Sequence, residues 1–279
     1  MIFKPKLLLK EVILFGAALF VGLVTANFYL HTSSDVGIVP VQYGFDYKDA
    51  IYFALFVTIF YFVLAKLKWL ASIALSLFLI ILVFSGSHIV AGVMFDIPWD
   101  FALAILFTLV FIFLRNVLIH NIGMILGLAG VCTILGLTIT PSAAVAIMVF
   151  LSIYDILAVY WTRHMVYLAQ GMIESGSIFG FVIPSTLRGF FVSGKEAKSQ
   201  IGTNFMILGS GDIGLPIIFT ASVANHSLNQ AIVVAAFSVL GLVATHLIFV
   251  NQSVRKPMAA LPPIATATII GYLLAIAIF

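Results

Sequence analysis

Long apolar segments separated by short polar ones run along most of this chain. A helix needs about 20 mostly apolar residues to cross a bilayer, and nine segments reach or approach that length. They are residues 12–30, 51–67, 70–95, 101–118, 122–137, 143–161, 205–224, 228–250 and 261–279. The pattern predicts an all-α membrane protein with nine transmembrane helices. We expect one membrane-embedded domain over residues 1–279, with six spans in 12–161, a connection at 162–204 and three spans in 205–279.

Composition supports a location in the lipid bilayer. Hydrophobic residues make up 63% of the chain and charged residues only 8%, which excludes an ordinary soluble domain. The formal net charge of +3 gives no indication of a nucleic-acid partner. Lysines precede the first apolar segment, as they do in a signal peptide. Because residues 12–30 are long enough to span and no clear cleavage site follows, we expect a first transmembrane helix.

The charges between the segments predict an orientation. Twelve of the 13 lysines and arginines fall in the N-terminal tail and in every second connection. The other connections are acidic, with Asp35, Asp46, Asp49, Asp96 and Asp100 against the single Lys48. Basic residues stay on the cytoplasmic side of membranes, so we expect the N-terminus in the cytoplasm and the C-terminus outside.

The longest connection, residues 162–204, is expected on the cytoplasmic side. Its first part is semi-apolar, but glycines and Pro184 interrupt any long helix. We expect an interfacial helix or a flexible gate there.

Two carboxylates fall inside the predicted spans, Asp155 in LSIYDILAVY and Asp212 in LGSGDIGLP, whereas the other acidic residues are expected in loops or tails. An acidic side chain at the centre of a membrane helix costs roughly 2.5–3.5 kcal/mol and is a functional candidate by default. Asp155 lies a short distance before the cytoplasmic end of the sixth span, and Asp212 a similar distance after the start of the seventh. Antiparallel neighbours would bring the two face to face.

The residues around these carboxylates favour an open, irregular site. Gly209 lies one helical turn before Asp212 and lets a backbone or a substrate approach. Gly211 removes further bulk and loosens the helix. Pro216 has no N–H, so the carbonyl of Asp212 loses its helical partner. Irregular backbone at membrane depth is tolerated where it lines a cavity.

Two carboxylates in near contact cannot both ionise cheaply, and they would share one proton. The charged one can accept a proton from water while the neutral one donates to a peptide carbonyl, as in aspartic proteases. The alternative is a proton- or cation-coupled transporter or channel that uses the same pair as a relay.

Two motifs carry a family resemblance. Tyr154-Asp155 in the sixth span and Gly209-Ser210-Gly211-Asp212 in the seventh resemble the YD and GxGD motifs of the presenilin and signal peptide peptidase family of intramembrane aspartyl proteases. The order and spacing of the spans also agree with that family. The resemblance implies a presenilin-like fold, Asp155 and Asp212 as catalytic residues, and Tyr154, Gly209 and Gly211 as supporting ones.

A third family motif, Pro-Ala-Leu, corresponds here to Ala259-Ala260-Leu261, with alanine in place of the proline. Neighbouring Pro257, Pro262 and Pro263 predict that the segment before the ninth span is not helical. We expect Ala259, Ala260 and Leu261 to bind substrate, as an extended edge that pairs with an unwound transmembrane strand. A plain loop before a helix is the alternative.

The resemblance also bears on source and partners. The predicted orientation is that of presenilins, and the connection at 162–204 is shorter than in the eukaryotic members. The chain therefore looks like an archaeal presenilin homologue of the cell membrane, which cleaves transmembrane helical peptides without obligate partner subunits.

Other protease chemistries fit the sequence less well. No His-Glu-x-x-His motif is present, so a zinc enzyme is not expected, nor any cofactor. Ser87 beside His88 superficially suggests a serine nucleophile, but such a site needs a histidine from another span, and only His246 lies deep in one.

Overall fold

The structure is a computed structural model, and it describes residues 5–35, 43–44, 68–162, 165, 171–173, 176–252 and 257–279. The predicted span at 51–67 lies outside these residues. Each of the other eight predicted spans contains a helix, which has the predicted ends at 228–250 and at least one shifted end in each of the other seven. Six of the described helices are long and apolar enough to cross a membrane, and two more are apolar but shorter.

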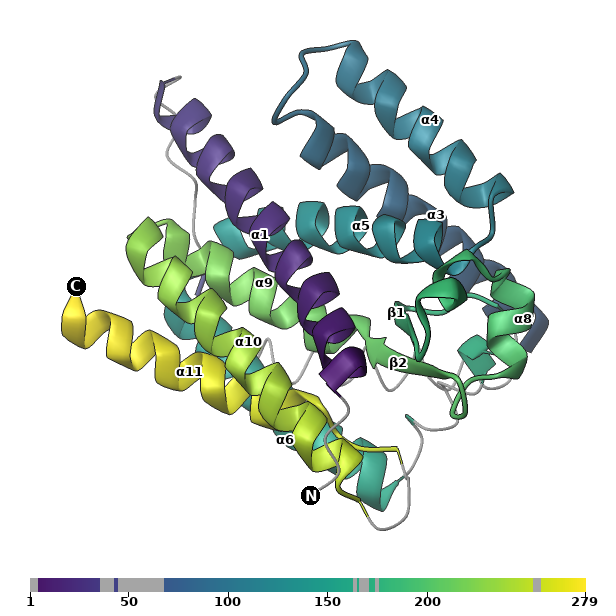
Figure 1. The fold of residues 1–279 in the computed structure, drawn as a ribbon. Coiled ribbons are helices and arrows are strands. Elements are labelled where there is room, and N and C mark those ends of the chain that lie inside the picture. Colours follow the sequence, from purple (N-terminus) through teal and green to yellow (C-terminus); the bar gives the residue numbers. More distant parts are fainter. Residues whose placement is uncertain are drawn as a thin grey trace.

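The helices cross one another in a bundle (Figure 1). They are α1 (Pro5–Asp35), α3 (Lys68–Ala91), α4 (Trp99–Phe113), α5 (Val117–Leu137), α6 (Pro141–Ile156), α9 (Ser210–Ala224), α10 (Leu228–Val250) and α11 (Leu261–Ile278). A π-helical turn, Leu157–Trp161, continues α6. Helix α1 packs against α5, α9 and α10, while α10 lies along α11 and α3 along α5 and α4. Glycines allow the closest approaches, since Gly86 touches the backbone of Gly127 and Gly130.

The connection at 162–204 was expected to form an interfacial helix or a flexible gate in its first part, and most of residues 163–175 lie outside the described ranges. It contains strand β1 (Gly180–Pro184), a 3₁₀ turn (Leu187–Phe191) and the short helix α8 (Gly194–Ser199). Strand β1 pairs antiparallel with β2 (Phe205–Gly209), with Phe181 opposite Leu208 and Ile183 opposite Met206. The predicted helix at 205–224 is therefore wrong over its first five residues, and α9 begins only at Ser210. A five-residue apolar run has no period that distinguishes a strand from a helix.

Side chains of α5 hold the sheet in place. Asn121 donates from Nδ2 to the carbonyl of Val182 at 2.8 Å and accepts from the N–H of Val182 at 2.8 Å, so its amide acts as a neighbouring strand would. His120 Nε2 lies 3.0 Å from the carbonyl of Gly180. The edge of β1 that faces away from β2 is thus satisfied by side chains, which is required of a buried strand.

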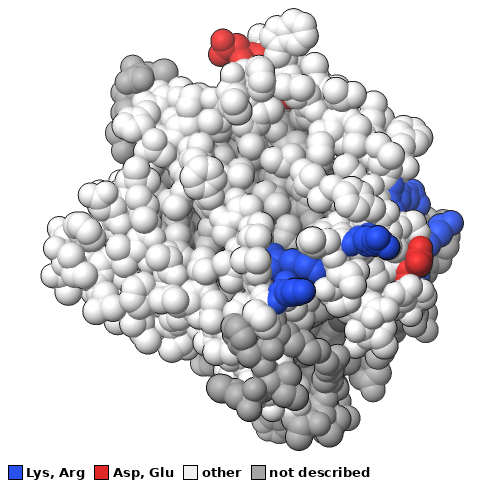
Figure 2. Space-filling view, viewed as in Figure 1, with Lys and Arg blue, Asp and Glu red and all other residues white. Residues whose placement is uncertain are grey.

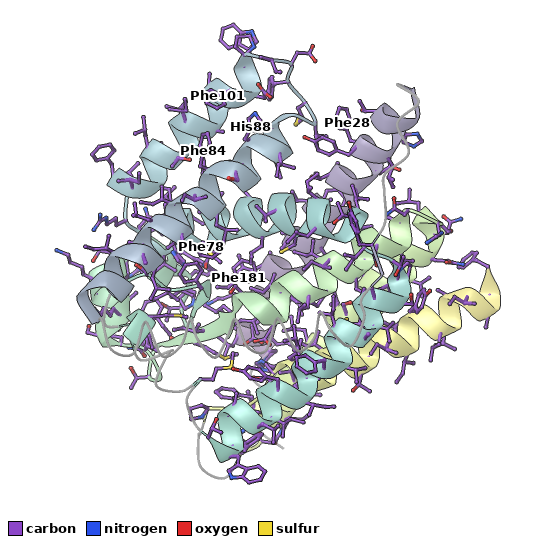
Figure 3. The ribbon with its side chains drawn as sticks, turned by 180° about the vertical axis from the view of Figure 1, so that it is seen from behind. Phe28, Phe78, Phe84, His88, Phe101 and Phe181 are labelled. Carbon is purple, nitrogen blue, oxygen red and sulfur yellow. The ribbon has the colours of Figure 1, made fainter. Side chains whose placement is uncertain are left out.

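The charged side chains lie mostly at two ends of the molecule. Figure 2 shows a largely uncharged face, with lysines and arginines near α8 and the start of α1, one acidic side chain among those near α8, and another at the end where α3 joins α4. At that acidic end, His88 of α3 lies 3.3 Å from Asp100 of α4, and its ring contacts Phe84 and Phe101 (Figure 3).

Candidate active site

Asp155 lies near the end of α6, directly before the π-helical turn, and only 6% of the residue is exposed. Turns of this kind are frequent at functional sites because they displace side chains from the regular helical face. The N–H of Leu261 donates to Oδ2 of Asp155 at 3.3 Å. Since Leu261 is the first residue of α11, its N–H has no acceptor within that helix, and Asp155 supplies one.

Asp212 lies in the first turn of α9, directly after β2. The prediction of a position seven residues into a helix is wrong, because the chain before Ser210 is a strand. The backbone of Gly209 forms a hydrogen bond with the carboxylate. The start of a helix also favours a negative charge, since its free N–H groups point toward that end.

The two glycines of this motif have different surroundings. A Cβ atom on Gly209 would lie 3.0 Å from Oδ2 of Asp212, so a side chain there would crowd the carboxylate. A Cβ atom on Gly211 would meet nothing within 4 Å. Gly209 precedes the helix rather than lying on its face, and α9 continues through Gly211 and Pro216 without a break.

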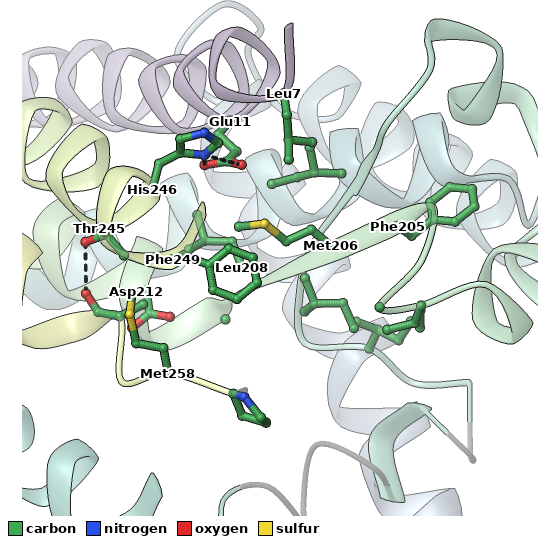
Figure 4. A pocket seen from close by; sticks show the side chains of 18 of the residues that line it. Leu7, Glu11, Phe205, Met206, Leu208, Asp212, Thr245, His246, Phe249 and Met258 are labelled. Carbon is green, nitrogen blue, oxygen red and sulfur yellow. Dashed lines mark hydrogen bonds and ion pairs between the residues drawn. The ribbon is translucent and has the colours of Figure 1, made fainter. Parts of the chain in front are cut away.

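Asp155 and Asp212 line one cavity of about 940 Å³, and they lie close enough for the charge of Asp155 to act on Asp212. Ligand cavities in proteins measure roughly 300–1,000 Å³, so this one is large. Its walls come from α1, the end of α6, β2, the start of α9, the end of α10 and residues 257–260 (Figure 4). The lining is mainly apolar, and it includes Leu7, Met206, Leu208, Phe249 and Met258.

The segment before α11 lies beside the carboxylates but is not an extended strand. Residues 257–260 are irregular, as predicted, and Ala260 already has helical dihedral angles, φ −89° and ψ −26°. Met258 and Ala260 line the cavity, whereas Ala259 and Leu261 are buried behind it. The expectation of an extended edge from Ala259 to Leu261 is therefore wrong, because the two last residues adopt helical geometry.

Strand β2 does provide such an edge. The N–H and carbonyl of Val182 bond to Asn121, so Val182 and Ile207 form a non-hydrogen-bonded pair of the ladder. The N–H and carbonyl of Ile207 consequently point away from β1. Ile207 lines the cavity, and β2 packs mainly against β1 and α9.

Tyr154 is half-buried on α6 and is not among the residues that line the cavity. Two residues that were not predicted as part of this site do line it, Glu11 of α1 and His246 of α10. Glu11 was expected in the N-terminal tail, but it lies in the second turn of α1 and is 1% exposed. Its position next to a long apolar run was the available signal.

The rival sites do not assemble in the described residues. Ser87 and His88 lie on α3, His88 pairs with Asp100, and none of the three lines the cavity that contains His246. Within the described ranges, no three His, Cys, Asp or Glu side chains gather as a metal site would need.

Comparisons with known proteins agree with this geometry. The chain matches the family described as "Signal-peptide peptidase, presenilin aspartyl protease" over residues 42–279. Two solved structures, each described as a presenilin family intramembrane aspartate protease, share its fold. The C222 crystal form has a TM-score of 0.63 at 19% identity, over 98% of both chains. The P2 form has a TM-score of 0.61 at 20% identity, over 95% of this chain and 97% of the other. A search of curated proteins gives no match.

Proposed function

The chain belongs to the signal-peptide peptidase and presenilin family of aspartyl proteases, and we propose that Asp155 and Asp212 are the carboxylates that catalyse its intramembrane proteolysis. The observation that carries the proposal is that both line one large cavity, close enough for the charge of Asp155 to act on Asp212. The GxGD type follows from the sequence Gly209-Ser210-Gly211-Asp212.

The two carboxylates divide the chemistry. One is ionised and takes a proton from a water molecule, whose oxygen attacks the carbonyl carbon of the peptide bond. The other is neutral and gives its proton to the carbonyl oxygen, which produces a tetrahedral intermediate. The intermediate collapses as the nitrogen takes a proton, and the C–N bond breaks. The two close carboxylates cannot both ionise cheaply, so the pair keeps one shared proton. The N–H of Leu261 and the start of α9 each favour negative charge, so the pair also keeps one charge.

The substrate is a transmembrane helix of another membrane protein. Its peptide bonds are shielded by helical hydrogen bonds, so a few residues must unwind before water can attack. An unwound strand can pair with the free N–H and carbonyl of Ile207 on β2, three residues before Ser210 and next to Asp212. Ala259, Ala260 and Leu261 are proposed to confine the substrate from the opposite wall, with Ala260 in contact and the other two behind it.

We also propose that the protein has nine transmembrane helices and a cytoplasmic N-terminus, and that it works in an archaeal cell membrane without obligate partner subunits. The basic side chains near α8 and the start of α1, and the acidic ones at the α3–α4 connection, support that orientation.

The test is cleavage of a single-span peptide by the purified protein in detergent, with products identified by mass. Asp155→Ala and Asp212→Ala should each abolish cleavage, and a hydroxyl-containing transition-state analogue should compete. Asp96→Ala, at an exposed position of the α3–α4 connection, is the matched control and should cleave normally. Ion flux in liposomes without any cleavage would contradict the proposal and favour a transporter.

A further inference from the structure

A second pair of ionisable side chains lies in the cavity wall. Nδ1 of His246 is 3.0 Å from Oε1 and 2.9 Å from Oε2 of Glu11 (Figure 4). The side chain of His246 is 0% exposed and that of Glu11 is 1% exposed. The hydrogen bond between Nδ1 and the Glu11 carboxyl group joins α10 to α1.

The pair is a poor choice for stability alone. Removing a carboxylate and an imidazole from water is costly, and apolar side chains of similar volume often serve a fold as well or better. Nε2 of His246 is also buried, and it has no partner among the described residues. An unsatisfied buried polar atom adds to the cost. A pair of this kind at membrane depth indicates a role in function.

Contacts lead from His246 to the carboxylate of Asp155. The neighbouring Thr245 donates to the carbonyl of Gly241 at 2.9 Å and lies 3.4 Å from the carbonyl of Ala260. The next residue, Leu261, donates its N–H to Asp155. The end of α10 therefore contacts the residue directly before Leu261, whose N–H donates to Asp155.

Helix α1 reaches the other wall of the cavity through the residue before Glu11. Lys10 Nζ donates to the carbonyls of Pro184 at 2.7 Å and Ser185 at 2.9 Å, at the end of β1. Adjacent residues of α1 thus bind β1 on one side and α10 on the other. The spacing of these two walls, which carry Asp212 and the donor to Asp155, depends on α1.

We propose that Glu11 and His246 are positioning residues, which fix α10 against α1 and so align Asp155 with Asp212. This inference rests on the proposed proteolytic function. The pair contributes to the rate of the chemical step rather than to substrate affinity, since the side chains are only 0% and 1% exposed although their residues lie in the cavity wall. The other titratable groups in the cavity wall are Lys6, Asp155 and Asp212.

The first test replaces both partners, Glu11→Leu with His246→Leu, so that no buried charge is left unpaired. We expect the double variant to fold, with a melting temperature equal to or above that of the wild type. Its KM for a single-span peptide should stay within about twofold, while kcat falls roughly 10- to 100-fold, because small misplacements of catalytic groups have effects of that size.

The second test separates the two nitrogens of the imidazole. His246→Asn places an amide nitrogen near the position of Nδ1 and keeps the hydrogen bond to Glu11, whereas His246→Gln places it near Nε2. We expect His246→Asn to retain most of kcat and His246→Gln to lose it. His226→Gln, at an exposed position in the turn before α10, is the matched control and should behave as the wild type.

The outcomes are distinct. A double leucine variant with wild-type kcat would overturn the positioning role, and proteolysis by the wild type would still support the proposed function. Retention of kcat by His246→Gln with its loss in His246→Asn would also overturn it, since Nε2 would then be the functional atom. A wild type that cleaves no peptide would overturn the proposed function and the positioning role together.

Discussion

Asp212 and the residue that bonds its carboxylate are three positions apart, whereas the N–H donor to Asp155 lies 106 positions along the chain. Strand β2, Gly209 and the first turn of α9 form the surroundings of Asp212 from one continuous segment. The surroundings of Asp155 require the end of α6, the irregular residues 257–260 and the start of α11 to meet. The local half of the site, around Asp212, is therefore built from neighbouring residues in the sequence. The tertiary half, around Asp155, is built from distant segments that the fold brings together.

The same physical device serves both halves. Each carboxylate lies at the start of a helix, Asp212 within its own helix α9 and Asp155 against the first residue of α11. Free N–H groups at a helix start stabilise negative charge wherever the acid comes from. We therefore expect substitutions at neighbouring positions in the sequence to displace the carboxylate of Asp212. Substitutions that alter helix packing should instead displace the surroundings of Asp155.

The largest loss of cleavage rate is expected when either carboxylate is removed. This loss tests whether the two halves of the site contribute equally to catalysis. Asp155→Asn and Asp212→Asn should each lower the cleavage rate by roughly 10²–10⁴-fold, since each removes one proton donor or acceptor of a pair. Initial rates on a single-span peptide measure this, with Asp96→Asn as the control. Substantial cleavage by either variant would show that the carboxylates do not act together.

The next largest loss of kcat is expected from a substitution in the local half of the site, around Asp212. Gly209→Ala places a methyl group about 3.0 Å from Oδ2 of Asp212 and should lower kcat about 10-fold by displacing the carboxylate. Gly211→Ala is the matched control two residues away, where a Cβ atom meets open space. It should keep kcat and raise the free energy of unfolding by roughly 0.5–1 kcal/mol. Equal kcat values for the two variants would contradict the local account.

A smaller loss of kcat is expected from a substitution that disturbs the tertiary half of the site, around Asp155. Gly241→Ala places a Cβ atom 2.7 Å from Cα of Ile264 and should push α11 away from α10, which moves the N–H of Leu261. Overpacking of this kind costs about 1–3 kcal/mol of unfolding free energy. We expect a lower melting temperature together with a several-fold lower kcat. Gly16→Ala on α1, where a Cβ atom meets nothing within 4 Å, should leave kcat unchanged and should not lower the melting temperature.

The smallest effect concerns the alanine that replaces the family's proline. Because residues 257–260 are irregular, Ala259→Pro should be accepted there. It should raise the free energy of unfolding by about 0.4–1 kcal/mol by restricting the unfolded chain, and leave kcat within about twofold. Thermal unfolding in detergent and a cleavage assay measure both. A large loss of kcat would mean that the N–H of Ala259 is needed for function.

The sequence predicted the helices well because each long apolar segment must form a helix in a bilayer, whichever helix it packs against. The prediction failed at 205–209, where the run is too short to show a period and is completed by a partner strand 25 residues upstream, from Gly180 to Pro184. The irregular backbone before α11 was predicted from its prolines, but its helical geometry at Ala260 was not.

By itself, the sequence determined that the chain spans a membrane, that Asp155 and Asp212 belong to apolar segments, and that glycines accompany Asp212. These properties follow from residue type and near neighbours. Only the tertiary structure decided that Leu261 bonds Asp155, that Asn121 completes the edge of β1, and that Glu11 meets His246 across 235 positions. Such contacts depend on which helices pack together and at what angle, and no local pattern of residues encodes that.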